Sequence, residues 1–181
     1  MREMNKMKFK HTFKLKTYII GIILIGIMGS GLYLYYQKMH AYPDTIEHFL
    51  RKYYTVSTYI EKPNDFNDVN VLMDQYRDCL TEEEIERFIS NRTILFNSLA
   101  AEEAGCTLNP QTINITLVDR ERPEYRYEMV VEAIYADNRH KDITLKGTLY
   151  MADHSKNSLI SGYYPDGSKV QIFDLLKQQD L

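Results

Sequence analysis

Residues 125–135, Tyr-Arg-Tyr-Glu-Met-Val-Val-Glu-Ala-Ile-Tyr, decide the fold of this chain because apolar and mostly polar side chains alternate along them. A period of two residues is typical of a β-strand with one buried face and one exposed face. The same alternation runs through residues 143–151 and, more briefly, through residues 113–117. A fourth strand is expected at about 158–164. This series predicts an antiparallel meander that is covered on one side.

Upstream of the strands, the apolar side chains recur every three or four residues, which predicts helices. The first helix is expected at Asp44–Tyr59, the second at about Asp68–Leu80, and a third from Thr81 onward. Thr81 and Glu84 have the spacing of a capping box at the start of the third helix.

Two local signals predict where this helical region breaks and ends. The Asn91-Arg92-Thr93 segment is expected to split the third helix, and Gly105 is expected to terminate it. At the other end of the chain, Val170–Leu176 is either a last strand or a short closing helix. Helices first and strands afterwards define an α+β fold, with three helices packed on one face of a curved four-stranded antiparallel sheet.

The stretch Tyr18–Tyr36 is uncharged and rich in isoleucine and leucine. As a helix it would rise about 28 Å, close to the hydrocarbon thickness of a bilayer. Basic residues precede it, which places the amino terminus in the cytoplasm and the rest of the chain outside. A cleaved signal peptide is the alternative, because the Gly29-Ser30-Gly31 segment is small enough for a cleavage site. The predicted parts are a basic tail (1–16), a transmembrane helix (17–37), a linker (38–43) and an extracytoplasmic α+β domain (44–181).

The charge is divided unevenly along the chain. Residues 1–16 hold six of the 22 basic residues and one of the 25 acidic residues, and residues 17–36 hold neither kind. The remaining 145 residues therefore carry a net charge of about −8. Phosphate binding needs a positive field, so the outer domain is not expected to bind nucleic acid. The basic tail is expected to lie against anionic membrane lipid.

The residues that commonly bind metals or carry out redox chemistry are scattered along the chain. Cys79 and Cys106 are too far apart in sequence for a Cys-x-x-Cys motif, and whether they form a disulfide is left open. A zinc site needs three or four convergent ligands, and the histidine positions do not predict such a group. We therefore expect no metal and no cofactor. The five histidines are His11, His40, His48, His140 and His154.

Acidic residues give no catalytic signature either. Tyr127 and Tyr135 point to the expected inner face of the sheet, but Glu128 and Glu132 alternate onto the opposite face. The Glu82-Glu83-Glu84 segment is interpreted as a helix start with a solvated face. The Glu102-Glu103 pair is interpreted as a solvated face. We therefore expect no catalytic residue, no small-molecule substrate and no enzymatic activity.

The arrangement resembles known architectures. Three amphipathic helices, the strands within 125–136 and 143–151, and the 159–164 segment with its Ser-Gly-Tyr-Tyr ending resemble the nuclear-transport-factor-type cone, the fold of ketosteroid isomerase. With a basic tail and one span in front of it, the whole plan is similar to VirB-eight-like proteins of type IV secretion, particularly the small ones of Gram-positive conjugation machines.

This resemblance implies a non-catalytic subunit of a membrane transfer channel. Its outer domain would act through contacts with other membrane protein subunits, including possible copies of itself. Two alternatives share the predicted topology. One is a single-span immunity or inhibitor protein against an extracytoplasmic toxin. The other is an anchored ligand-binding or enzymatic cone, which a deep cavity with a buried carboxylate would favour.

Overall fold

The computed structural model describes residues 28–30, 42–58, 66–119, 121–152, 158–167 and 171–177. The chain divides into two compact units, Met1–His40 and Ala41–Leu181. Within the first unit, residues 28–30 are helical and exposed. The rest of the predicted span lies outside the described residues, and so does the basic tail. Among the residues that are described, no helix combines the length and the apolar character needed to cross a membrane.

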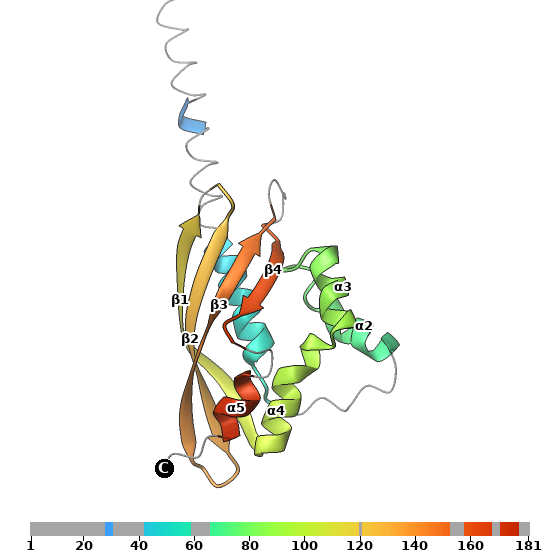
Figure 1. Ribbon diagram of the computed structural model, residues 1–181, viewed down its shortest axis with the longest axis vertical. Helices are drawn as coiled ribbons and strands as arrows, with labels where there is room; N and C mark the ends of the chain where they lie inside the picture. Colours follow the sequence, from blue (N-terminus) through green and yellow to red (C-terminus); the bar gives the residue numbers. More distant parts are fainter. Residues whose placement is uncertain are drawn as a thin grey trace, which may run out of the picture. The chain divides into compact units, whose positions relative to one another are not determined.

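The second unit contains the predicted four-stranded antiparallel sheet, and it confirms the α+β class. The strands are β1 (Cys106–Asp119), β2 (Glu124–Tyr135), β3 (His140–Met151) and β4 (Ile160–Pro165). They follow one another in the order β1-β2-β3-β4, so each strand pairs with its neighbour in the sequence (Figure 1).

The alternation of side chains along β2 and β3 is confirmed. Met129 pairs with Leu145 and Val131 with Ile143, and all four side chains are buried. The alternating residues on β2 are less buried: Arg126 and Glu128 are exposed, and Val130 and Glu132 are half-buried. One face of the sheet therefore forms the core and the other meets solvent.

The start of β1 differs from the prediction. The strand begins at Cys106, well before the alternation at residues 113–117 that predicts it, and Pro110 lies inside it. Proline is tolerated there because β1 is an edge strand, and the pairing with β2 shifts register just after Pro110. Leu108 is buried and exchanges two backbone hydrogen bonds of 3.0 Å with Val56.

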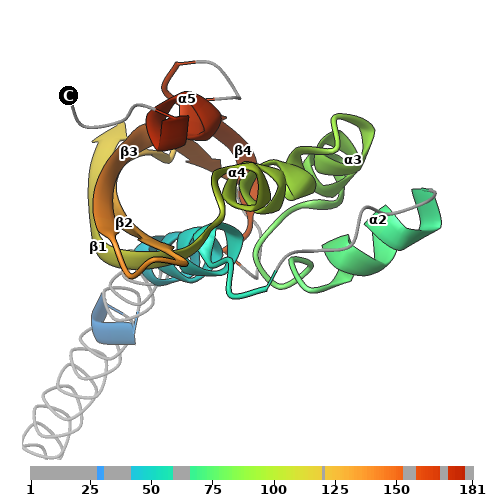
Figure 2. The same ribbon diagram turned by 90° about the horizontal axis from the view of Figure 1, so that it is seen from below.

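The helices cover the concave side and one edge of the sheet. Figure 2 shows the strands curving around the helix at residues 42–54 (cyan), α4 (Phe96–Ala104) and α5 (Gln171–Lys177), whereas α3 (Glu82–Ser90) lies beside β4 and α2 (Phe66–Asp74) lies farther out, next to α3. The carboxyl-terminal segment, for which a last strand or a short closing helix was expected, forms the helix α5. The helices are residues 42–54, α2 (Phe66–Asp74), α3 (Glu82–Ser90), the 3-10 turn η1 (Thr93–Leu95), α4 (Phe96–Ala104) and α5 (Gln171–Lys177).

Two predicted helix ends are wrong for the same reason. The first helix stops at residue 54 rather than 59 because Val56 forms a bridge to Leu108. The second stops at Asp74 rather than at Leu80: residues 75–79 form turns, and the Cys79 carbonyl and the Thr81 N–H, on either side of Leu80, bond to the backbone of Ile160. Backbone groups that pair with a strand are not available to continue a helix.

The other helix signals are confirmed. Thr81 caps α3 by accepting a hydrogen bond of 3.3 Å from the backbone N–H of Glu84. Arg92 adopts a left-handed φ of 52°, which separates α3 from η1. Gly105 ends α4 with a φ of 67°, a conformation that glycine adopts without strain.

An aromatic cluster joins the helices to β4. Phe49, Tyr53, Phe88 and Tyr163 are all buried, and every pair of their rings has a centroid distance between 5.3 and 6.1 Å. Most of these pairs are edge-on, the geometry favoured by the ring quadrupole. Because its members come from the first helix, α3 and β4, the cluster fixes these three elements against one another.

Candidate functional site

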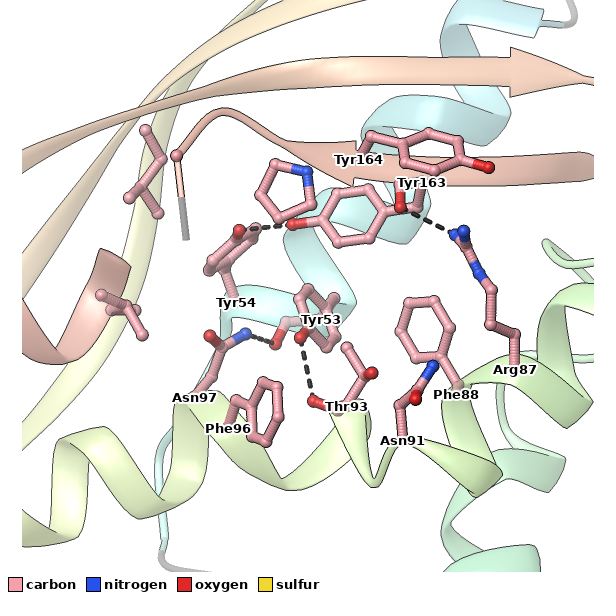
Figure 3. Close-up of a pocket in the computed structure, with 14 residues that line it drawn as sticks. Tyr53, Tyr54, Arg87, Phe88, Asn91, Thr93, Phe96, Asn97, Tyr163 and Tyr164 are labelled. Carbon is pink, nitrogen blue, oxygen red and sulfur yellow. Dashed lines mark hydrogen bonds between the residues drawn. The ribbon is translucent and has the colours of Figure 1, made fainter. Parts of the chain in front are cut away.

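A pocket of about 320 Å³ lies beside this aromatic cluster. It is formed where residues 53–54, the segment from α3 to α4, β4 and α5 meet (Figure 3). Six of its fourteen lining residues are aromatic, and the others include amide, hydroxyl and aliphatic side chains. The lining residues are Tyr53, Tyr54, Arg87, Phe88, Asn91, Thr93, Phe96, Asn97, Leu145, Tyr163, Tyr164, Pro165, Gly167 and Ile172.

Three tyrosine hydroxyls form a chain at the inner end of the pocket. The Tyr163 hydroxyl is hydrogen-bonded to the hydroxyl of Tyr54 and, at 3.2 Å, to that of Tyr127 (Figure 3 shows the first bond). Burial raises the pKa of all three hydroxyls, which therefore stay protonated at neutral pH.

Two backbone carbonyls are fixed by side chains of the same wall. The buried amide of Asn97 donates a hydrogen bond of 2.8 Å to the carbonyl of Tyr53. The Tyr53 hydroxyl donates one of 3.0 Å to the carbonyl of Thr93. These bonds attach the end of the first helix to the start of α4, so the wall of the pocket is preformed.

Glu84 and Arg87 hold β4 at the mouth of the pocket. The Glu84 carboxylate accepts a hydrogen bond of 3.0 Å from the N–H of Tyr163 and forms an ion pair with Arg87. Arg87 also donates to the Tyr163 carbonyl at 2.8 Å, and its guanidinium carbon lies 4.5 Å from the ring centroid of Tyr164 (Figure 3). Both backbone polar groups of Tyr163 are therefore bound by side chains of α3.

This arrangement corrects the prediction for the acidic segment at the start of α3. Glu82 and Glu83 are exposed as expected, but Glu84 is only 2% exposed. Because β4 is an edge strand, the N–H of Tyr163 needs an acceptor from outside the sheet. The sequence signal for this contact was weak, namely an acid and a base three residues apart beside the apolar stripe of α3.

The predicted inner-face tyrosines pack as expected. Tyr127 is buried in the hydroxyl chain, whereas Tyr135 is half-buried and donates a hydrogen bond of 3.4 Å to the carbonyl of Leu176. Glu128 and Glu132 lie on the opposite face. Glu128 pairs with Lys146 at 3.1 Å, and Glu132 pairs with His140 at 2.7 Å.

The remaining histidines lie in different surroundings. His140 is exposed, and His48 is exposed and lies 3.4 Å from a carboxylate oxygen of Asp78. His11, His40 and His154 lie outside the described residues. The histidines that the structure places therefore do not converge on one another.

In the described part of the chain no disulfide joins Cys79 and Cys106, and both side chains are buried, which answers the question of a disulfide. Burial and the neighbouring Asp78 raise the pKa of Cys79 to about 12. Burial also raises the pKa of Cys106. Neither thiol is activated as a nucleophile in this state.

Taken together, the fold and the pocket define an α+β domain with a four-stranded antiparallel meander and a pocket lined in part by aromatic side chains at one edge of the sheet. No protein-family model matches the chain, and none of the curated proteins is similar to it in sequence.

Proposed function

We propose that this protein is a non-catalytic, membrane-anchored subunit of a conjugative transfer or type IV secretion channel. Its outer domain acts through contacts with other membrane proteins. Helices followed by a meander, and the curvature of the sheet around the first helix, α4 and α5 (Figure 2), support the likeness to the nuclear-transport-factor-type cone. The predicted span and the basic tail supply the anchor in this proposal.

The observation that carries the proposal is the mouth of the pocket. Tyr164 is 50% exposed, and Arg87 lies over its ring. Tyrosine and arginine are the residue types that most often anchor protein interfaces when they surround a preformed hollow. A side chain of a partner subunit that enters this pocket would contact aromatic rings along its wall and hydroxyl groups at its inner end.

The state of the buried carboxylate favours binding over chemistry. An isomerase-type cone uses a carboxylate base that is free to take a proton from the substrate. Glu84 is the buried carboxylate in the described part of the chain, and it is held by Arg87 and by the N–H of Tyr163. Its contacts fasten β4 to α3, which is a structural task.

A ligand-binding cone is the second candidate, and the pocket itself favours it. A volume of about 320 Å³ is at the lower end of the range for small-molecule sites. The Tyr54 and Tyr163 hydroxyl oxygens in its wall could each accept a hydrogen bond from a hydroxyl group of such a ligand. The two candidates differ in what occupies the pocket, so one experiment can separate them.

The test places a photo-crosslinking phenylalanine derivative at position 164 of the full-length chain in intact cells. The matched control places it at Asn114, which is exposed on β1 at the opposite edge of the sheet. We expect position 164, and not position 114, to crosslink to subunits of a transfer or secretion apparatus. A secreted toxin as the partner would support the immunity alternative.

Two outcomes would count against the channel subunit. One is crosslinking at position 164 to lipid alone, with no protein partner. The other is recovery of the full-length chain from the soluble fraction without detergent, which would remove the anchor. Protease added to protoplasts provides a further check, because it should digest the carboxyl-terminal unit of an outward-facing protein.

A further inference from the structure

A second group of chemically active side chains lies away from the pocket, where the turn after α2 meets the first helix. His48 comes from that helix, and Asp78 and Cys79 come from the turn. The Nε2 atom of His48 lies 3.4 Å from Oδ2 of Asp78, and Sγ of Cys79 lies 3.3 Å from Oδ1 of the same carboxylate. All three ligand atoms lie within 4.8 Å of one another.

These separations fit the coordination shell of a small cation. Zinc bonds of about 2.0–2.1 Å to nitrogen and oxygen and about 2.3 Å to sulfur place neighbouring ligand atoms roughly 3.3–3.5 Å apart in a tetrahedron. Imidazole, carboxylate and thiolate are the three ligand types that zinc takes in proteins. The group therefore needs only small side-chain movements to bind one ion.

The backbone of the turn is held in place by its neighbours. The N–H of Cys79 donates to the carbonyl of Tyr76 at 3.0 Å, and the Cys79 carbonyl accepts from the N–H of Ile160 at 2.8 Å. Cys79 is 1% exposed, but its sulfur contacts the carboxylate of Asp78, whose side chain is 59% exposed. The sulfur thus lies just beneath the surface and within reach of an ion from solvent.

We propose that His48, Asp78 and Cys79 bind a zinc-type divalent cation through Nε2, a carboxylate oxygen and Sγ, with water in the fourth position. The ion replaces the thiol proton, which leaves to water, and the sulfur binds as thiolate. Bound in this way, the cation cross-links the first helix to the turn after α2. The site cannot be recognised from the spacing of its residues in the sequence, because His48 lies 30 residues before Asp78.

Lys52 sets the affinity of this site. Its ammonium lies 3.6 Å from Oδ1 of Asp78, one helical turn after His48. It competes with a cation for the same carboxylate. Neutralising Lys52 should therefore strengthen binding of the cation, roughly fivefold.

The test titrates the full-length chain in detergent with Co²⁺, the spectroscopic substitute for Zn²⁺. We expect one Co²⁺ per chain, with the charge-transfer absorption of a thiolate ligand, and displacement of the Co²⁺ by Zn²⁺. The Cys79→Ser variant should lose this absorption, whereas Cys106→Ser, which removes the other buried thiol, should keep it. His48→Gln should weaken binding at least about tenfold, and Lys52→Gln should tighten it.

The proposal is overturned if the unmodified chain shows no thiolate-to-cobalt absorption at saturating Co²⁺, or if this absorption persists in Cys79→Ser. If the buried Cys79→Ser substitution prevents folding, the two surface variants decide the question. His48→Gln and Lys52→Gln that both bind with unchanged affinity refute the site. Weaker Co²⁺ binding by His48→Gln together with tighter Co²⁺ binding by Lys52→Gln supports it.

Discussion

Replacing Glu84 with alanine should destabilise the domain far more than its position in an acidic run suggests. The substitution removes the acceptor of the Tyr163 N–H and the charge partner of Arg87. Its neighbour Glu83, on the same helical turn, is exposed. Comparing the two alanine variants therefore isolates the contribution of the buried carboxylate.

The expected magnitude follows from what each lost contact leaves behind. A buried N–H without an acceptor costs about 1–3 kcal/mol. Breaking a buried ion pair costs about 3–5 kcal/mol, but the Arg87 side chain is 33% exposed and keeps part of its hydration. We therefore expect Glu84→Ala to lower the free energy of unfolding by about 3 kcal/mol. Glu84→Gln keeps an acceptor oxygen and should cost about half as much.

The assay is urea unfolding of the full-length protein in detergent, followed by the near-ultraviolet signal of the tyrosines. Glu83→Ala should stay within about 0.5 kcal/mol of the unmodified protein. If Glu84→Ala is as mild as Glu83→Ala, the carboxylate does not hold β4 to α3 and the reasoning is refuted.

Three further outcomes can be checked by the same unfolding assay. Gly147→Ala should cost about 1–3 kcal/mol, because its Cβ would lie 2.6 Å from both the Tyr127 ring and the Tyr164 carbonyl. Gly105→Ala, which is strained only by its positive φ, should cost about 1 kcal/mol. A larger loss of stability in Gly105→Ala than in Gly147→Ala would contradict the close approach at Gly147. Tyr163→Phe breaks both bonds of the hydroxyl chain and should cost roughly 1–2 kcal/mol, with no loss expected if the chain is not formed. Burial raises the pKa of the buried tyrosines above the ordinary value of 10.0, so their contribution to the free energy of unfolding is complete below about pH 10. This contribution is lost as the pH rises further, by up to about 1.4 kcal/mol per pH unit for each tyrosine. A stability that does not change with pH above about pH 10 would contradict their burial.

The sheet could be predicted from the sequence because its signal is local. The two-residue period of β2 and β3 depends only on which face is buried, and the structure confirms it. The helix ends could not be predicted in the same way. Val56 and Leu80 leave the helical pattern in order to pair with Leu108 and Ile160, and those partners lie 52 and 80 residues away.

The pocket and the proposed cation site were beyond sequence reasoning for a related reason. Glu84 looked solvated because its partner, the N–H of Tyr163, exists only once β4 forms an edge of the sheet beside α3. His48 and Asp78 meet only because the turn after α2 packs against the first helix. Residue types suggest what chemistry is available, but the contacts between separate elements decide where it is assembled.

The contacts at Tyr163 also bear on how copies of this domain can associate. An edge strand with free N–H and C=O groups invites another chain to add a strand, which leads to aggregation. At β4 both groups of Tyr163 are occupied by α3, and at the other edge of the sheet Pro110 lacks an N–H and precedes a shift of register. Any self-association at these positions consequently relies on side-chain recognition, so that copies of the domain brought close together would not polymerise through their backbones.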